Sequence, residues 1–140
     1  MLKQFIFEKA IKQKMKKTQV NPGFNVSDYL EKIPVFFDAK KSADRKLIVV
    51  YEFHDSGKND GAWTVTIANG KCSLSKGASD IYDTLIYMTA ESYSRILSGK
   101  LDYLRLAYST GAIRYFGNTL GHRELNSYLT LPKDAGVAAL

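Results

Sequence analysis

The chain has 140 residues, of which 45% are hydrophobic and 24% are charged, and its one cysteine is Cys72. A chain of this length buries enough surface to fold without disulfides or structural metals. A single cysteine excludes an internal disulfide, and the apolar runs are shorter than the roughly 20 residues that a membrane-spanning helix requires. We therefore expect one domain over residues 1–140, located in the cytoplasm, with neither metal nor cofactor.

The positive charge is concentrated at the start of the chain. The net charge is +6, and residues 1–17 contribute +5 of it through six lysines and one glutamate, Glu8, which leaves +1 for the rest. Apolar residues at helical spacing predict a helix over about residues 2–17. This helix either contacts an anionic membrane surface or packs on the core as a solubilising element, while the near-neutral body argues against nucleic-acid binding. The candidate membrane-contact residues are Lys3, Lys9, Lys12, Lys14, Lys16 and Lys17.

A second helix is predicted to begin near residue 27 or 28. Asp28 and Glu31 have the spacing of a capping box, and Val26 precedes them as a candidate hydrophobic staple. A proline inside a helix removes a backbone hydrogen bond and clashes with the preceding turn. We therefore expect Pro34 to kink or divide this helix.

The periodicity then changes from helical to strand-like. Residues 47–53 alternate, with Leu47, Val49, Tyr51 and Phe53 on one face, and residues 63–67 alternate apolar side chains with threonine. The pair at 69–70 is Asn-Gly, the strongest short signal for a tight hairpin, and it leads to a strand over 71–75. A fourth strand is predicted over 82–88.

The second half of the chain predicts two helices, a strand and a last helix. Thr89 is a candidate N-cap for the first helix, and Asp102 is one for the second. A fifth strand is predicted over 113–116, a final helix after Gly117, and a loose tail over 133–140. The fold class is therefore α+β, with one five-stranded sheet and helices packed on one of its faces.

Few residues are candidates for catalysis. His54 and His122 lack the spacing of metal ligands, and we interpret both as polar surface residues. An enzyme that used Glu52, His54 and Asp55 would need these side chains to converge in a pocket, whereas strand geometry directs them toward solvent. Cys72 is interpreted as a small, half-buried strand residue. The sequence therefore predicts a protein that is not an enzyme.

The aromatic residues are more informative than the polar ones. Tyr51, Phe53, Trp63 and Tyr115 share the predicted inner face of the sheet, and the second helix ends in two phenylalanines. Such a layer is either plain core or the wall of an apolar cavity, and alternation alone does not separate the two.

The opposite face of the sheet is mostly polar, with apolar exceptions. If these apolar residues are neighbours, they form a surface for a homodimer or another partner; otherwise they are scattered surface residues. The candidate dimer residues are Val50, Leu85, Tyr87 and Phe116.

The ordered set of motifs between Tyr51 and Leu129 resembles the sterol-binding domains of the sterol carrier protein 2 family. These motifs are the strand and hairpin at 63–71, the strand at 83–88, the Gly-Lys-Leu-Asp at 99–102, the segment at 107–113 and the Phe-Gly-Asn at 116–118. The chain departs from the family at Tyr103, where a proline is usual, and at Ala112, where a lysine is frequent.

The resemblance implies a fold and a function. It implies a five-stranded sheet with an apolar tunnel between sheet and helices, and non-catalytic binding and transfer of a sterol, fatty acid, acyl-CoA or phospholipid. The alternative is a domain of the same fold whose core is filled and which acts as a homodimer or protein-interaction module. The wall residues that we expect are Phe36, Phe37, Tyr51, Phe53, Trp63, Val65, Ile86, Met88, Leu97, Leu104, Tyr108, Ile113, Leu125 and Leu129.

Overall fold

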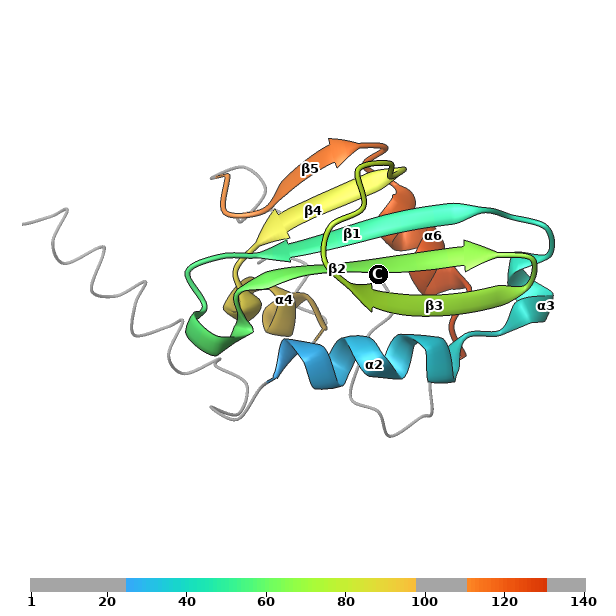
Figure 1. Ribbon diagram of the computed structural model, residues 1–140, viewed down its shortest axis with the longest axis horizontal. Helices are drawn as coiled ribbons and strands as arrows, with labels where there is room; N and C mark the ends of the chain where they lie inside the picture. Colours follow the sequence, from blue (N-terminus) through green and yellow to red (C-terminus); the bar gives the residue numbers. More distant parts are fainter. Residues whose placement is uncertain (1–24, 98–110, 131–140) are drawn as a thin grey trace, which may run out of the picture.

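A five-stranded mixed sheet forms the centre of the computed structural model, which describes residues 25–97 and 111–130 (Figure 1). The strand order is β3-β2-β1-β4-β5, and β1 pairs antiparallel with β2 but parallel with β4. The predicted helices over 2–17 and after Asp102 and the predicted tail lie outside the described residues. The strands are β1 (Leu47–Phe53), β2 (Gly61–Ala68), β3 (Lys71–Lys76), β4 (Thr84–Met88) and β5 (Arg114–Gly117).

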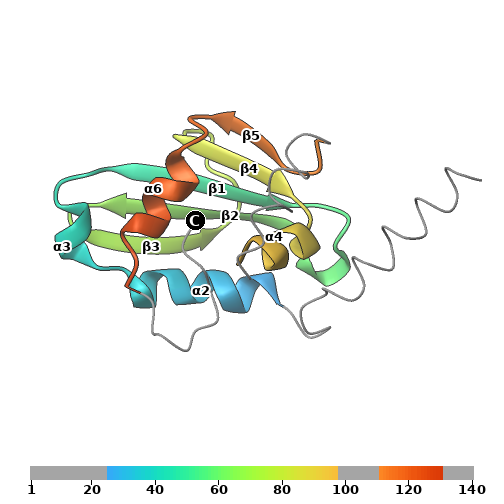
Figure 2. The same ribbon diagram turned by 180° about the vertical axis from the view of Figure 1, so that it is seen from behind.

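Three helices cover one face of the sheet (Figure 2). They are α2 (Val26–Phe36), α4 (Ala90–Leu97) and α6 (Gly121–Ser127), and the short elements α3 (Ala39–Ser42) and η1 (Gly57–Asn59) lie in connections. Apolar side chains of all three helices join the inner-face residues of the strands in one buried cluster. The predicted α+β class with helices on one face is therefore confirmed. Among the described residues, no helix is long and apolar enough to cross a membrane.

Helix α2 has a different N-cap than predicted, and it continues past Pro34. Its N-cap is Asn25, whose side chain accepts a hydrogen bond from the Asp28 backbone, so the predicted capping box is wrong. Pro34 neither divides nor ends the helix, which continues to Phe36. Because Pro34 lies in the last turn, the helix loses a single backbone bond there, and burial of Leu30 and Ile33 holds the segment against the sheet.

The structure confirms the predicted hairpin between β2 and β3, whereas two later elements begin at other residues than predicted. Asn69 and Gly70 both have positive φ angles, 55° and 71°, as the predicted two-residue turn between β2 and β3 requires. Strand β4 begins at Thr84 and not at residue 82, and helix α6 begins at Gly121 and not after Gly117. Thr89 caps α4 as predicted, because its hydroxyl accepts from the Ser92 backbone at 3.0 Å.

The connection between β3 and β4 crosses the outer face of the sheet, in front of β2 and β1 in Figure 1. The Thr64 hydroxyl fastens it by donating to the Gly77 carbonyl at 2.8 Å and accepting from the Ser79 backbone at 3.0 Å. Val50 and Thr64 are consequently 0% and 4% exposed. The prediction that Val50 belongs to an exposed apolar patch is therefore wrong, because the chain's own crossover covers it.

Helix α6 lies against the start of β4 through Gly121, which is buried. A methyl group at this position would overlap the Thr84 side chain. The Thr84 hydroxyl donates to the Asn118 carbonyl and cannot move away without losing that bond. Close contact here sets the distance between α6 and the sheet.

We predict that Gly121→Ala destabilises the protein by about 1–3 kcal/mol, the usual cost of an overpacked contact. The free energy of unfolding in urea measures this cost. Thr84→Ala in the same chain should recover part of it, since it removes the hydroxyl oxygen that the new methyl group overlaps most closely. Additive effects of the two substitutions would contradict the proposed contact.

Candidate functional site

The inner face of the sheet and the helices enclose an apolar layer that contains most of the predicted wall residues. Phe36 and Phe37 pack half-buried against this layer. The Leu97 side chain, Leu104 and Tyr108 fall outside the described residues. The predicted wall residues that are buried in one cluster are Tyr51, Phe53, Trp63, Val65, Ile86, Met88, Ile113, Leu125 and Leu129.

Aromatic rings fill the middle of this layer. The Phe53 ring lies 5.8 Å from the Trp63 ring and 5.4 Å from the Tyr93 ring, measured between centroids. Tyr93 in turn meets Tyr51 at 5.6 Å and Tyr29 at 5.5 Å. These are the separations at which aromatic pairs attract one another beyond their burial. Tyr29 and Tyr93 are absent from the predicted wall residues, although both lie on predicted helices at the spacing of buried neighbours.

A chain of three polar side chains crosses the apolar layer. The Tyr51 hydroxyl lies 2.8 Å from Nδ1 of His122, and the Asn126 amide nitrogen lies 3.3 Å from Nε2 of the same ring. His122 is 6% exposed and Tyr51 is fully buried. The interpretation of His122 as a surface residue is therefore wrong, because α6 turns it toward β1. The spacing of β1 and α6 in the sequence gives no signal for this contact.

Burial sets the charge states of this polar chain. It lowers the pKa of His122 to about 4, so the imidazole is neutral at physiological pH. It also raises the pKa of Tyr51 well above its ordinary value, so the phenol keeps its proton. A second proton on the ring would place an N–H against the Asn126 amide donor. The polar chain thus crosses the layer without bringing a charge into it.

Surface contacts hold α6 in the position that this polar chain requires. The Arg45 Nε donates to Glu124 at 2.6 Å, and the Tyr128 hydroxyl donates to the same carboxylate at 2.7 Å. The Arg45 guanidinium is the main cause of the lowered pKa of Glu124. An isolated bridge between Phe37 and Leu129 joins the end of α6 to the end of α2.

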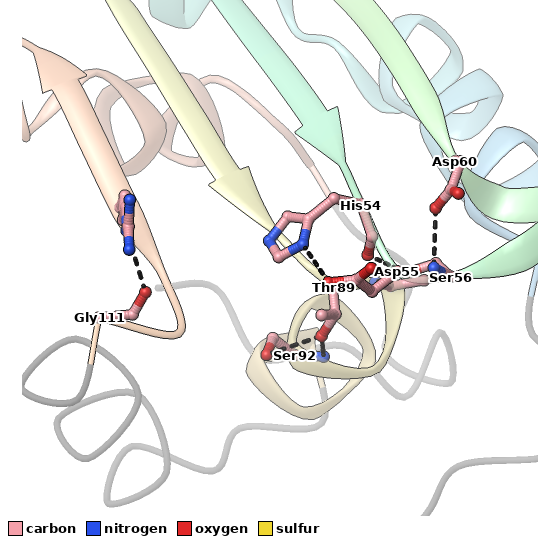
Figure 3. A network of polar contacts seen from close by, with 9 residues as sticks. His54, Asp55, Ser56, Asp60, Thr89, Ser92 and Gly111 are labelled. Carbon is pink, nitrogen blue, oxygen red and sulfur yellow. Dashed lines mark hydrogen bonds and ion pairs between the residues drawn. The ribbon is translucent and has the colours of Figure 1, made fainter.

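The other histidine lies at the end of β1, on the outer side of the sheet (Figure 3). The His54 ring stacks on Tyr87, with centroids 4.0 Å apart, and its Nδ1 lies 3.0 Å from an Asp55 carboxylate oxygen. The Asp55 side chain is 88% exposed, so the pair lies open to solvent. The described residues contain no group of three or more side chains that could hold a metal ion.

The apolar layer reaches the surface beside β5. Ile113 is buried in the core cluster, and Tyr115 packs half-buried against it. Both residues also line a shallow surface hollow of about 360 Å³, together with Gly111, Arg114 and Phe116. Arg114 is exposed here, and its Nε donates to the Gly111 carbonyl at 3.3 Å. The hollow therefore combines apolar walls with one cation.

The buried His122 predicts a loss of stability in acid. Its pKa is about 4 in the folded protein and near 6.5 in the unfolded chain, so the unfolded chain binds the proton more readily. The contribution of the neutral His122 ring to the free energy of unfolding is complete above about pH 6.5. This free energy falls by about 3 kcal/mol as the pH falls toward 4. Urea unfolding at a series of pH values measures this slope.

His122→Gln is the matched control for this pH dependence, because glutamine keeps polar atoms at the site and does not titrate there. We expect the slope between pH 6.5 and 4 to flatten in this variant, while the fall below pH 4.5 that Glu124 causes should remain. An equally steep slope in both proteins would assign the acid sensitivity to other groups.

Solved structures with the same fold are found although the sequence matches no family model and no curated protein. Two structures of the sec-alkylsulfatase Pisa1, one from Pseudomonas sp., align with TM-scores of 0.68 and 0.64 at 18% and 19% identity. They cover 79% and 75% of this chain, which spans only 17% and 16% of the sulfatase.

Two sterol carrier structures align over most of their own length. The sterol carrier protein domain 2 of Helicoverpa armigera has a TM-score of 0.57 at 21% identity and covers 77% of this chain and 88% of its own. Sterol carrier protein 2 of Yarrowia lipolytica has a TM-score of 0.55 at 16% identity and covers 81% and 99%. These alignments show that the chain has the fold of the sterol carrier protein 2 domains.

Proposed function

We propose that this protein binds an apolar lipid between its sheet and its helices and carries it between membranes in the cytoplasm, without catalysis. The observation that carries the proposal is an apolar layer that reaches the surface beside β5, where Ile113 and Tyr115 line the hollow. The fold that the chain shares with two solved sterol carriers supports it. The ligand classes are a sterol, a fatty acid, an acyl-CoA and a phospholipid.

Burial of the acyl or sterol body supplies the binding free energy in this proposal. Each methylene group transferred from water to an apolar layer contributes about 0.8 kcal/mol, so a long chain binds without a strong polar anchor. The Tyr51 hydroxyl and the His122 ring pair with each other, so the layer does not depend on the ligand for polar contacts. We propose that the wall of the ligand site consists of the predicted wall residues that are buried in this apolar layer.

We place the entrance of the ligand at the hollow beside β5. An acyl chain that entered over Ile113 and Tyr115 would leave its head group near Arg114. The guanidinium is exposed and permanently charged, and it forms strong hydrogen bonds with a carboxylate or a phosphate. This position favours an anionic lipid over a neutral one.

The lysine-rich segment at 1–17 supplies a second part of the proposal. Lysines near an anionic membrane contribute about 1 kcal/mol each, so the six lysines hold the protein at a membrane while lipid enters or leaves. The described part of the chain carries no net charge, with eleven basic and eleven acidic residues. The electrostatic attraction therefore depends on this segment.

A filled core is the second candidate, and the aromatic contacts favour it. The Phe53 ring lies 5.8 Å from the Trp63 ring and 5.4 Å from the Tyr93 ring, which leaves no room for an acyl chain between Phe53 and either neighbour. In this case the domain acts through its surface, as a homodimer or as a module that binds another protein. Leu85, Tyr87 and Phe116 remain available on the outer face, since Val50 is covered.

Native mass spectrometry of the purified protein separates the two candidates. Lipid binding predicts a discrete adduct with the mass of a fatty acid, sterol or phospholipid, and organic extraction should release it. Incubation of the extracted protein with mixed lipids should restore the adduct. A clean protein mass before and after incubation would favour the filled core, and a dimer mass would favour it further.

Arg114→Gln tests the proposed head-group contact within the same measurement. We expect this variant to bind a fatty acid about tenfold more weakly and the corresponding fatty alcohol as before, because only the carboxylate meets the guanidinium. Arg123→Gln is the matched control, since Arg123 is exposed and does not line the hollow. Equal losses for acid and alcohol would contradict an ionic contact.

The lysine-rich segment predicts salt-dependent attraction to anionic vesicles. Replacement of its six lysines by glutamine should lower the partition coefficient onto phosphatidylserine-containing vesicles by more than tenfold at 0.1 M salt. Vesicle sedimentation measures this coefficient, with Lys71→Gln and Lys76→Gln on β3 as controls. Unchanged partitioning would assign the segment a solubilising role.

A further inference from the structure

Most of the exposed large apolar side chains gather at one end of the sheet. Of the five such side chains in the described part, only Val35 of α2 lies elsewhere. This loop-tip patch consists of Ile81, Tyr82, Phe116 and Leu120, which are 77%, 37%, 48% and 61% exposed. Ile81 and Tyr82 precede β4, Phe116 is on β5, and Leu120 lies between β5 and α6.

Hydrogen bonds hold the two loops of this patch side by side. The Asn118 backbone N–H donates to the Asp83 carbonyl at 2.7 Å, and the Asp83 N–H donates to the Ile48 carbonyl at 2.9 Å. On the first loop, the Ser79 hydroxyl donates to the Ile81 carbonyl at 2.6 Å. On the second, Asn118 accepts from the Leu120 N–H at 2.9 Å. The apolar side chains are thus exposed from ordered turns.

We propose that this loop-tip patch inserts into the interface of a lipid bilayer and docks the sheet end of the protein on a membrane. The proposal deepens the proposed lipid function, because a carrier has to meet the membrane from which it takes its ligand. The patch lies on the described body of the protein and contains no residue of the lysine-rich segment.

Area and shape favour a membrane over a second protein. The four side chains together expose on the order of 400 Å² of apolar surface, about half of the ~800 Å² per partner in a stable protein interface. Ile81 and Leu120 lie in the loops before β4 and before α6 and are 77% and 61% exposed. A bilayer accepts such exposed side chains because it imposes no complementary shape.

The polar surroundings of the patch fit the headgroup region. Tyr82 is half-covered, and tyrosine is enriched at the level of lipid headgroups, where its ring is buried and its hydroxyl is wet. Arg123 is exposed one turn beyond Leu120, and Lys46 immediately precedes β1 at the same end of the sheet. Asp80 is the exposed carboxylate next to Ile81, and it limits the preference of the patch for anionic lipids.

Partitioning of the full chain onto vesicles tests the proposal. The variant Ile81→Ser with Leu120→Ser should lower the partition coefficient about tenfold or more on phosphatidylcholine vesicles and on vesicles that also contain phosphatidylserine. Val35→Ser is the matched control, because Val35 is 76% exposed and lies on α2, and it should change partitioning less than twofold. All three side chains are exposed, so thermal unfolding should stay the same.

A positive signal for insertion comes from Leu120→Trp. The natural tryptophan, Trp63, is buried, so a vesicle-dependent blue shift and quenching by brominated lipid report on position 120. We expect both signals with phosphatidylcholine vesicles at high salt, where lysine attraction is screened. Absence of both signals, or equal partitioning of the serine variant and the unchanged protein, would overturn the proposal.

Two further measurements distinguish membrane docking from dimerisation and from lipid carriage. If the unchanged protein is a dimer that the serine variant breaks, the patch binds a second copy and the membrane proposal fails. If the serine variant keeps its lipid adduct in native mass spectrometry but loses vesicle binding, both proposals stand. If no adduct forms in either protein while vesicle binding still falls, lipid carriage fails and membrane docking stands.

Discussion

Parallel pairing between β1 and β4 is the constraint on which the rest of this structure depends. Two parallel neighbours need a connection that returns across the sheet, and here the chain does so over the outer face after β3. The crossover is fastened through Thr64 on β2, and Asp83 at its end accepts from the Ile48 N–H at 2.8 Å. It buries Val50 and leaves Ile81 and Tyr82 at the sheet end. The helices thus cover the inner face, and the crossover covers the outer face only over β2 and β1.

The inner face carries a second constraint, which is the buried contact between Tyr51 and His122. An apolar layer tolerates polar side chains only when they satisfy one another, and this pair with Asn126 does so without a net charge. The contact joins the central strand to α6 across 71 residues of sequence. Close approach at Gly121 and the Arg45–Glu124 ion pair act on the same helix, so three separate contacts determine where α6 lies.

An apolar layer between sheet and helices and an apolar loop end suit a protein that exchanges lipids with a membrane. In the proposed carrier the interior would take up the apolar body of a ligand, and the hollow beside β5 combines Ile113 and Tyr115 with the Arg114 cation. The same fold occurs within the larger sec-alkylsulfatase Pisa1 and in two solved sterol carrier structures that it spans almost entirely. Fold alone therefore does not decide between a carrier and an accessory module. Filling of the aromatic layer is the physical difference between them.

Local patterns in the sequence determined most of the secondary structure and the inner face. Alternation placed Tyr51, Phe53 and Trp63 on one side of the sheet, and Asn69-Gly70 predicted the hairpin, because both depend on residues close in the chain. The tertiary structure alone decided the burial of His122 and Val50 and the exposure of Ile81 and Leu120. These outcomes depend on which distant segment covers a side chain. Periodicity assigns a residue to a face of its element, but only the packed chain shows whether that face is covered.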